Sequence, residues 1–84
     1  MAFNGVGNFW IAPNSTVVQD GWGWNGADHG AQYFSANPKT SNVELQMSHE
    51  TKGRNSSGGV YYGFTVTNLS NVWVNYDLQG GGFS

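Results

Sequence analysis

The residues best suited to chemistry lie near the carboxyl end of the chain, where Trp73, Asn75 and Asp77 occupy alternate positions. The positions around them are apolar, namely Val72, Val74, Tyr76 and Leu78. Successive side chains of a strand point to opposite faces, so this alternation predicts a strand with one buried and one exposed face. An exposed indole can cover the C–H face of a pyranose, and carboxamide and carboxylate groups can bond its hydroxyls. The pattern therefore indicates a sugar-binding surface, unless the outward Trp packs beneath a loop or against another subunit.

A second candidate site lies in the glycine-rich segment 21–30, which contains Trp22, Trp24, Asn25 and Asp28. We expect a loop or a bulged strand end here, because glycines permit turns and close approach of the backbone to a ligand. In a binding role, a Trp supplies an aromatic ring, and Asn25 and Asp28 supply hydrogen bonds. In a structural role, one Trp fills the core and the other covers an end of the fold. Both interpretations remain open from the sequence.

The strand expected at 60–67 is the natural partner of the strand at 72–78, because only a short polar connection separates them. We expect the two to form an antiparallel pair in which opposed residues share a face. Gly63 would then leave a shallow dish beside Trp73, and Tyr61 or Gly63 would lie across from Asp77. If the alternating segment 43–51 pairs with the other edge of 60–67, Gln46 joins the same dish.

The elements needed to hold these residues are all strands. The fold class we expect is an all-β antiparallel sandwich, or a barrel-like meander, of about five to six short strands with no substantial helix. The whole chain, 1–84, should form a single domain. The expected strands cover residues 8–12, 16–19, 31–36, 43–51, 60–67 and 72–78, with a polar loop at 52–59 and a patternless tail at 79–84.

No catalytic set stands out in the sequence. Glu44, Glu50 and Asp77 could in principle supply the paired carboxylates of a glycosidase, but such pairs need a deep cleft that a thin sheet rarely builds. No nucleophile elbow or phosphate-binding loop is present either. We therefore expect a protein that is not an enzyme.

We also expect no metal and no cofactor. The spacing of Asp20, Asn25 and Asp28 matches no calcium loop and lacks a bidentate Glu. The residues His29 and His49 are far apart and have no Cys to complete a metal site, so each is expected to be a hydrogen-bonded structural residue.

Composition limits the partners. The 84 residues include no Cys and only three Lys or Arg, and the formal net charge is −2. So few positive charges argue against nucleic acid as a partner. The high aromatic content of a small chain without disulfides favours a homo-oligomer. The sequence shows no signal peptide and no membrane-spanning run, which leads us to expect a cytoplasmic protein or one released without a leader.

Two functions of different classes follow. The first is a lectin-like protein that recognises a neutral glycan and gains avidity by oligomerising. In composition the chain resembles small lectins of fungi and bacteria, although it shares no motif with them. The alternative is a non-catalytic structural or interaction subunit whose exposed aromatic residues contact other subunits or lipid headgroups.

Overall fold

The computed structural model describes residues 4–23, 25–28, 30 and 32–82. Among these residues there are six antiparallel strands and no helix. The strands are β1 (Asn4–Ile11), β2 (Thr16–Trp22), β3 (Gln32–Pro38), β4 (Leu45–Arg54), β5 (Val60–Asn68) and β6 (Val74–Gly82). The expected all-β fold class is thus confirmed. Within the described part of the chain, no helix is long and apolar enough to cross a membrane.

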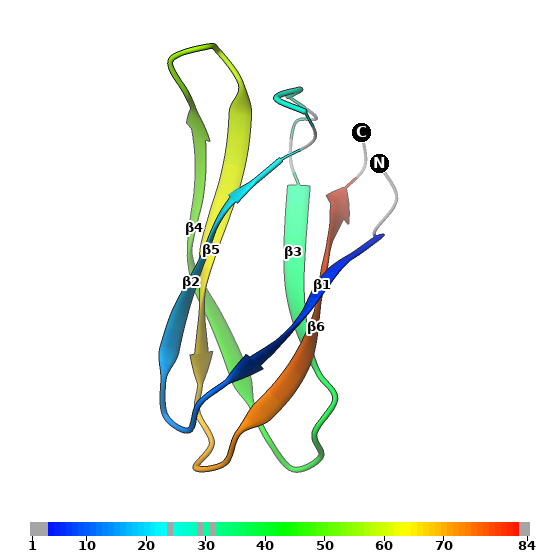
Figure 1. Cartoon of the computed structure of the whole chain (residues 1–84), viewed down its shortest axis with the longest axis vertical. Coiled ribbons are helices and arrows are strands. Elements are labelled where there is room, and N and C mark those ends of the chain that lie inside the picture. The colour runs from blue at the N-terminus through cyan, green and yellow to red at the C-terminus, as the bar shows by residue number, and fades with distance from the viewer. Residues whose placement is uncertain (1–3, 24, 29, 31, 83–84) are drawn as a thin grey trace.

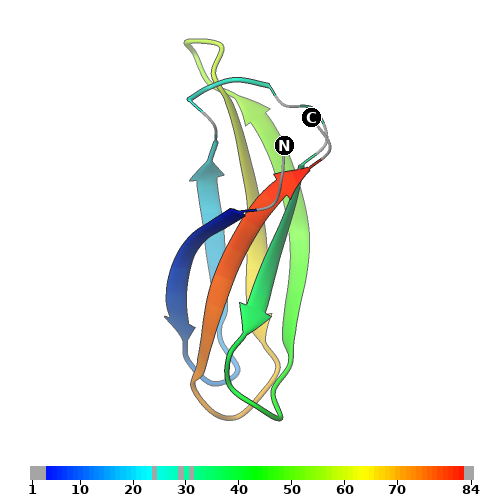
Figure 2. The same ribbon diagram turned by 90° about the vertical axis from the view of Figure 1, so that its right-hand side faces the viewer.

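The strands form two three-stranded sheets, ordered β1-β6-β3 and β2-β5-β4. The sheets pack face to face, as the two layers of Figure 1 show. Figure 2 looks onto the first sheet, with β6 running between β1 and β3 and the second sheet behind it. Of the two architectures that the sequence allows, the fold is therefore the sandwich and not the barrel-like meander.

The two central strands supply most of the core. On β5 the alternate residues Val60, Tyr62, Phe64 and Val66 are buried, as their spacing predicts. On β6 the buried apolar side chains are Val74, Tyr76 and Leu78. Side chains from the outer strands, including Ile11 and Phe34, complete the same cluster.

The expected pairing of β5 with β6 is wrong. The two strands are the middle strands of opposite sheets, and residues 69–73 carry the chain from one sheet to the other. Even-numbered residues point inward on both strands, which suits either a shared sheet or two sheets facing each other. Periodicity alone could not distinguish the two arrangements.

Asn68 holds this crossing in place. Its side chain is 1% exposed, and Nδ2 donates to the carbonyl oxygens of Ala12 (3.1 Å) and Val72 (2.8 Å), with a longer contact to that of Ile11 (3.4 Å). Its Oδ1 accepts a hydrogen bond from the backbone N–H of Ser70. One buried amide thus joins the β1–β2 turn to the β5–β6 connection.

Several strand limits differ from expectation: β1 starts earlier, at Asn4, β2 and β3 end later, at Trp22 and Pro38, and β4 starts later, at Leu45. Strand β4 extends to Arg54, so the exposed loop is shorter than 52–59, and β6 continues through the glycines to Gly82. Gly80 is required in β6, because a Cβ there would come within 2.6 Å of the ring of Phe34. Val72 precedes β6 and is 46% exposed, so its expected inward position is wrong.

Candidate functional site

The outer face of the sheet β1-β6-β3 carries a group of amide and carboxylate side chains. We call this surface the amide face and define it by Asn8, Asn37, Asn75, Asp77 and Gln79. Asn75, Asp77 and Gln79 alternate along β6 with the buried residues, as the sequence predicts. The register places Asn8 of β1 and Asn37 of β3 on either side of Asp77.

Hydrogen bonds fix these side chains in place. Asn8 and Asn75 exchange a reciprocal pair, with Nδ2 to Oδ1 distances of 3.1 and 2.9 Å. Asn8 Nδ2 also donates to Asp77 Oδ1 at 2.7 Å, and Asn75 Nδ2 donates to the carbonyl oxygen of Phe9. On the β3 side, Asn37 Nδ2 donates to Gln79 Oε1 at 3.1 Å. Such a network lowers the entropy cost of binding, because the groups are ordered beforehand.

The same network leaves groups available for a ligand. Asp77 Oδ2 is met by Lys39 Nζ at 3.6 Å, an exposed contact that a ligand hydroxyl could share. The Nε2 group of Gln79 has no hydrogen-bond acceptor among the described residues, since only its Oε1 is engaged. The face thus presents a carboxylate acceptor, an ammonium donor and an amide donor side by side. That combination matches hydroxyl groups, which both donate and accept.

Three exposed aromatic residues lie on or next to this sheet. Trp10 lies across from Asn75 on β1 and is 63% exposed, and Trp73, immediately before β6, is 59% exposed. At the other end, Tyr33 lies across from Gly81 on β3 and is 53% exposed. Each of these rings is accessible to a ligand or to a partner surface.

Two residues assigned to this site from the sequence lie elsewhere. Tyr61 and Gln46 belong to the outer face of the opposite sheet, because β5 does not pair with β6. The ring of Tyr61 lies over Gly53, where an added Cβ would come within 2.5 Å of it. The space above Gly63 is occupied by the side chains of Asp20 and Thr51, so the expected dish does not exist.

The second predicted zone does not join the amide face. Trp22 is half-buried, packs edge-on against Phe9 at 6.4 Å between ring centroids, and donates from Nε1 to Gln19 Oε1. Trp22 therefore packs at the margin of the core, which agrees with the structural role that the sequence analysis offered for one of the two Trp residues. Asn25 adopts a left-handed conformation (φ 55°) in an exposed turn. Trp24 and His29 lie outside the described residues.

Asp28 anchors the loop that follows β2. It accepts a hydrogen bond from Lys52 Nζ at 2.8 Å and another from the backbone N–H of Gly30, and Arg54 lies 3.6 Å away. The Lys52 hydrogen bond, followed by that of Gly30, lowers the pKa of the Asp28 carboxyl. This ion pair ties the loop to β4, which is a structural role.

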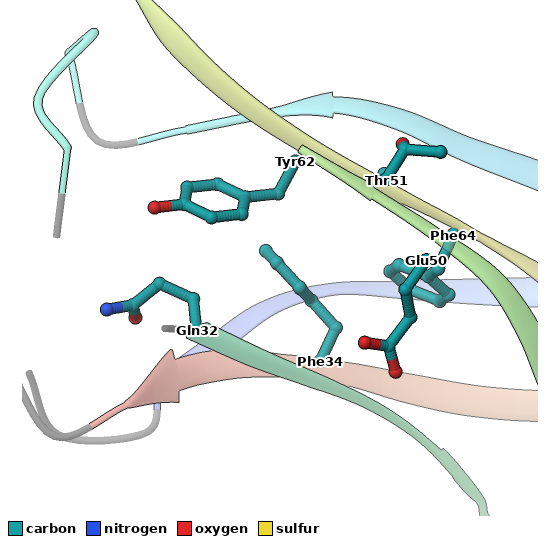
Figure 3. A pocket seen from close by; sticks show the side chains of 7 residues that line it. Gln32, Phe34, Glu50, Thr51, Tyr62 and Phe64 are labelled. Atoms are coloured by element: carbon teal, nitrogen blue, oxygen red, sulfur yellow. The ribbon is translucent and has the colours of Figure 1, made fainter. Parts of the chain in front are cut away.

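A separate hollow of about 270 Å³ lies along the edge of the sandwich where β3 approaches β4. It is lined by Gly30, Gln32, Glu50, Thr51, Lys52 and Tyr62. Figure 3 shows the narrower recess beside it, where Phe34 from β3 faces Tyr62 from β5 and the carboxylate of Glu50 lies near Phe34. The strand β4 bulges between Ser48 and Thr51, and His49 there has a positive φ of 54°, a geometry that redirects neighbouring side chains.

The amide face is the stronger candidate of the two. The hollow brings a carboxylate, a carboxamide and a threonine hydroxyl to an aromatic wall, and its Lys52 is already paired with Asp28. The amide face has a connected polar row with aromatic rings at both ends. In the described part of the chain, no three His, Asp or Glu side chains come together to hold a metal.

Three residues of the amide face, Asn8, Asn37 and Gln79, and the adjacent Trp10 were missed from the sequence. Asn8 and Trp10 alternate with the inward-facing Phe9 and Ile11, and Asn37 alternates with Phe34 and Ala36. The same period of two that revealed β6 could have revealed these positions. Gln79 was lost with the glycine-rich tail, which has no apolar alternation to mark it as a strand.

Comparison of the chain with protein-family models, with curated proteins and with solved structures finds no match. The fold and the site therefore define a class by their geometry alone: a small β-sandwich with a preordered polar sheet face bordered by exposed aromatic rings.

Proposed function

We propose that this protein is a lectin-like, non-catalytic module that binds a neutral glycan on the amide face. The observation that carries the proposal is the hydrogen-bonded group of Asn8, Asn75 and Asp77 beside the exposed ring of Trp10. An aromatic ring covers the apolar face of a pyranose, and the polar groups beside it bond the ring's hydroxyls. A neutral ligand suits a face where Asp77 is already close to Lys39.

A flat site of this kind gives modest affinity for one glycan. The amide face is an open sheet surface, so it excludes less water from a bound sugar than a cleft would. Several copies of the site on one particle would raise the apparent affinity for clustered glycans. We therefore include homo-oligomerisation in the proposal, as a means of gaining avidity.

Tryptophan fluorescence and a glycan array test the proposal. We expect the array to identify a neutral glycan whose addition changes Trp emission, because Trp10 and Trp73 border the site. Trp10→Ala should remove most of the binding. Asp77→Asn keeps an acceptor for Asn8 but loses the charge-assisted bonds, so it should weaken binding about tenfold.

Gln46→Ala is the matched control, since Gln46 is an exposed polar residue on the opposite sheet. It should leave glycan affinity unchanged. A blank array, or an equal loss of binding in Gln46→Ala and Asp77→Asn, would contradict the proposal.

One observation favours the alternative function of an interaction subunit. The connection between β5 and β6 exposes three large apolar residues within five positions, namely Leu69, Val72 and Trp73. If these residues form a subunit or lipid contact, Leu69→Ser combined with Val72→Ser should change the mass measured by light scattering or abolish binding to liposomes. The alternative replaces the glycan-binding proposal only if glycan titrations of the wild-type protein also show no binding, because a contact at 69–73 is compatible with a glycan site on the amide face.

A further inference from the structure

Two exposed aromatic residues mark opposite corners of the amide face. Trp10 lies on β1 across from Asn75, and Tyr33 lies on β3 across from Gly81. Because β1 and β3 flank β6 on opposite sides, the line from Trp10 to Tyr33 crosses the face diagonally. Figure 2 shows this sheet from its outer side, with β6 between its two neighbours.

The strand register sets the length of this diagonal. The step from Asn75 to Gly81 is six residues, or about 20 Å along β6, and the flanking strands are about 10 Å apart. A single pyranose covers roughly a quarter of such a path. One sugar ring therefore cannot touch Trp10 and Tyr33 together.

Polar groups occupy the middle of the path. Asp77 and Gln79 point outward from β6 between the two corners, about 7 Å apart along the strand. Gly81 has no side chain, so β6 places no bulk in front of Tyr33. Along the diagonal the ring of Trp10 is therefore followed by the carboxylate acceptor of Asp77, the amide donor of Gln79 and the ring of Tyr33.

We infer that the amide face binds the interior of an extended, unbranched neutral glycan of roughly four sugar rings, rather than a single terminal sugar. This inference rests on the proposed function and adds the class of glycan. Equatorial linkages give a flat ribbon whose ring faces can lie on aromatic side chains at both ends. The hydroxyls along the ribbon's edges then reach Asp77 and Gln79. A coiled glycan would leave the sheet before it reached the second ring.

The test uses titration calorimetry to measure how the affinity of the whole protein depends on the length of the glycan. The probes are cello-oligosaccharides and N-acetylated chito-oligosaccharides of one to six rings. We expect affinity in at least one series to rise on the order of tenfold between one and four rings and then level off. Tyr33→Ala should remove this rise.

Two further variants act as controls. Tyr33→Phe keeps the ring and should keep the chain-length effect. Val18→Ala removes an exposed apolar side chain from the opposite sheet, so it should change nothing.

The outcomes separate this inference from the proposed function. Equal affinity for one and four rings, or a rise that Tyr33→Ala does not alter, overturns the inference and leaves the proposed function intact. Absence of binding in both series also overturns the inference. Only a blank glycan array in addition would overturn the proposed function.

Discussion

At the scale of single residues, the amide face depends on Asn8. Its Nδ2 group reaches both Asn75 Oδ1 and Asp77 Oδ1, so one β1 side chain orders two β6 side chains. Without it, the carboxylate of Asp77 would keep, among the described residues, only the longer contact to Lys39. One side chain of β1 thus holds two groups of the proposed site in position.

The buried pair of Tyr76 and Gln19 makes stability depend on pH. Gln19 Nε2 donates to the Tyr76 hydroxyl at 2.9 Å, and burial raises the pKa of that hydroxyl above its ordinary value of about 10. The folded state therefore holds the phenol proton more tightly than the unfolded state does. This contribution to stability is present below about pH 10 and is lost as the pH rises further.

We expect Tyr76→Phe to lower the free energy of unfolding by about 1–2 kcal/mol at pH 7, because Gln19 Nε2 loses its acceptor in the core. The variant should also lose less stability than the wild type between pH 9 and about 11. Urea unfolding at a series of pH values measures both effects. The exposed Tyr33→Phe serves as control, and a Tyr76→Phe variant with the wild-type pH slope would refute the assignment.

At the scale of elements, the critical feature is the crossing from β5 to β6. The side-chain amide of Asn68 donates to the carbonyl oxygens of Ala12, in the β1–β2 turn, and of Val72, in the β5–β6 connection. Removing the amide therefore leaves these carbonyl oxygens without a donor. We expect Asn68→Ala to destabilise the fold by about 2–4 kcal/mol. Chemical denaturation compares it with Asn71→Ala, an exposed change in the same connection, which should cost little. Similar small losses in both variants would show that Asn68 does not hold the crossing.

The sequence predicts strands better than it predicts their partners. Alternation identified β5 and most of β6 because each strand carries a regular buried set, such as Val74, Tyr76 and Leu78. It failed for the pairing because nothing in the pattern shows that Asn68 turns inward and sends the chain to the other sheet. For the same reason Asn75 and Asp77 were placed on the correct face, but with Tyr61 as a neighbour instead of Asn8 and Asn37.

At the scale of the whole molecule, each sheet has two edge strands in the described part of the chain. Exposed edges and the apolar connection at 69–73 provide surfaces through which copies could associate. We expect light scattering to report a mass above that of one chain at micromolar concentration. Leu69→Ser should lower this mass if the connection forms the contact. If the measured mass is that of one chain at every concentration, the proposed gain of avidity through homo-oligomerisation is wrong.

The most direct test of the central claim is to map glycan binding by NMR through the side-chain amide signals of Asn and Gln. We predict that a bound glycan shifts the signals of Asn8, Asn37, Asn75 and Gln79, which form the amide face, and leaves that of Gln46 on the opposite sheet in place. Shifts confined to Gln46 and its neighbours, or to the edge hollow near Glu50, would contradict the claim that the amide face is the binding site.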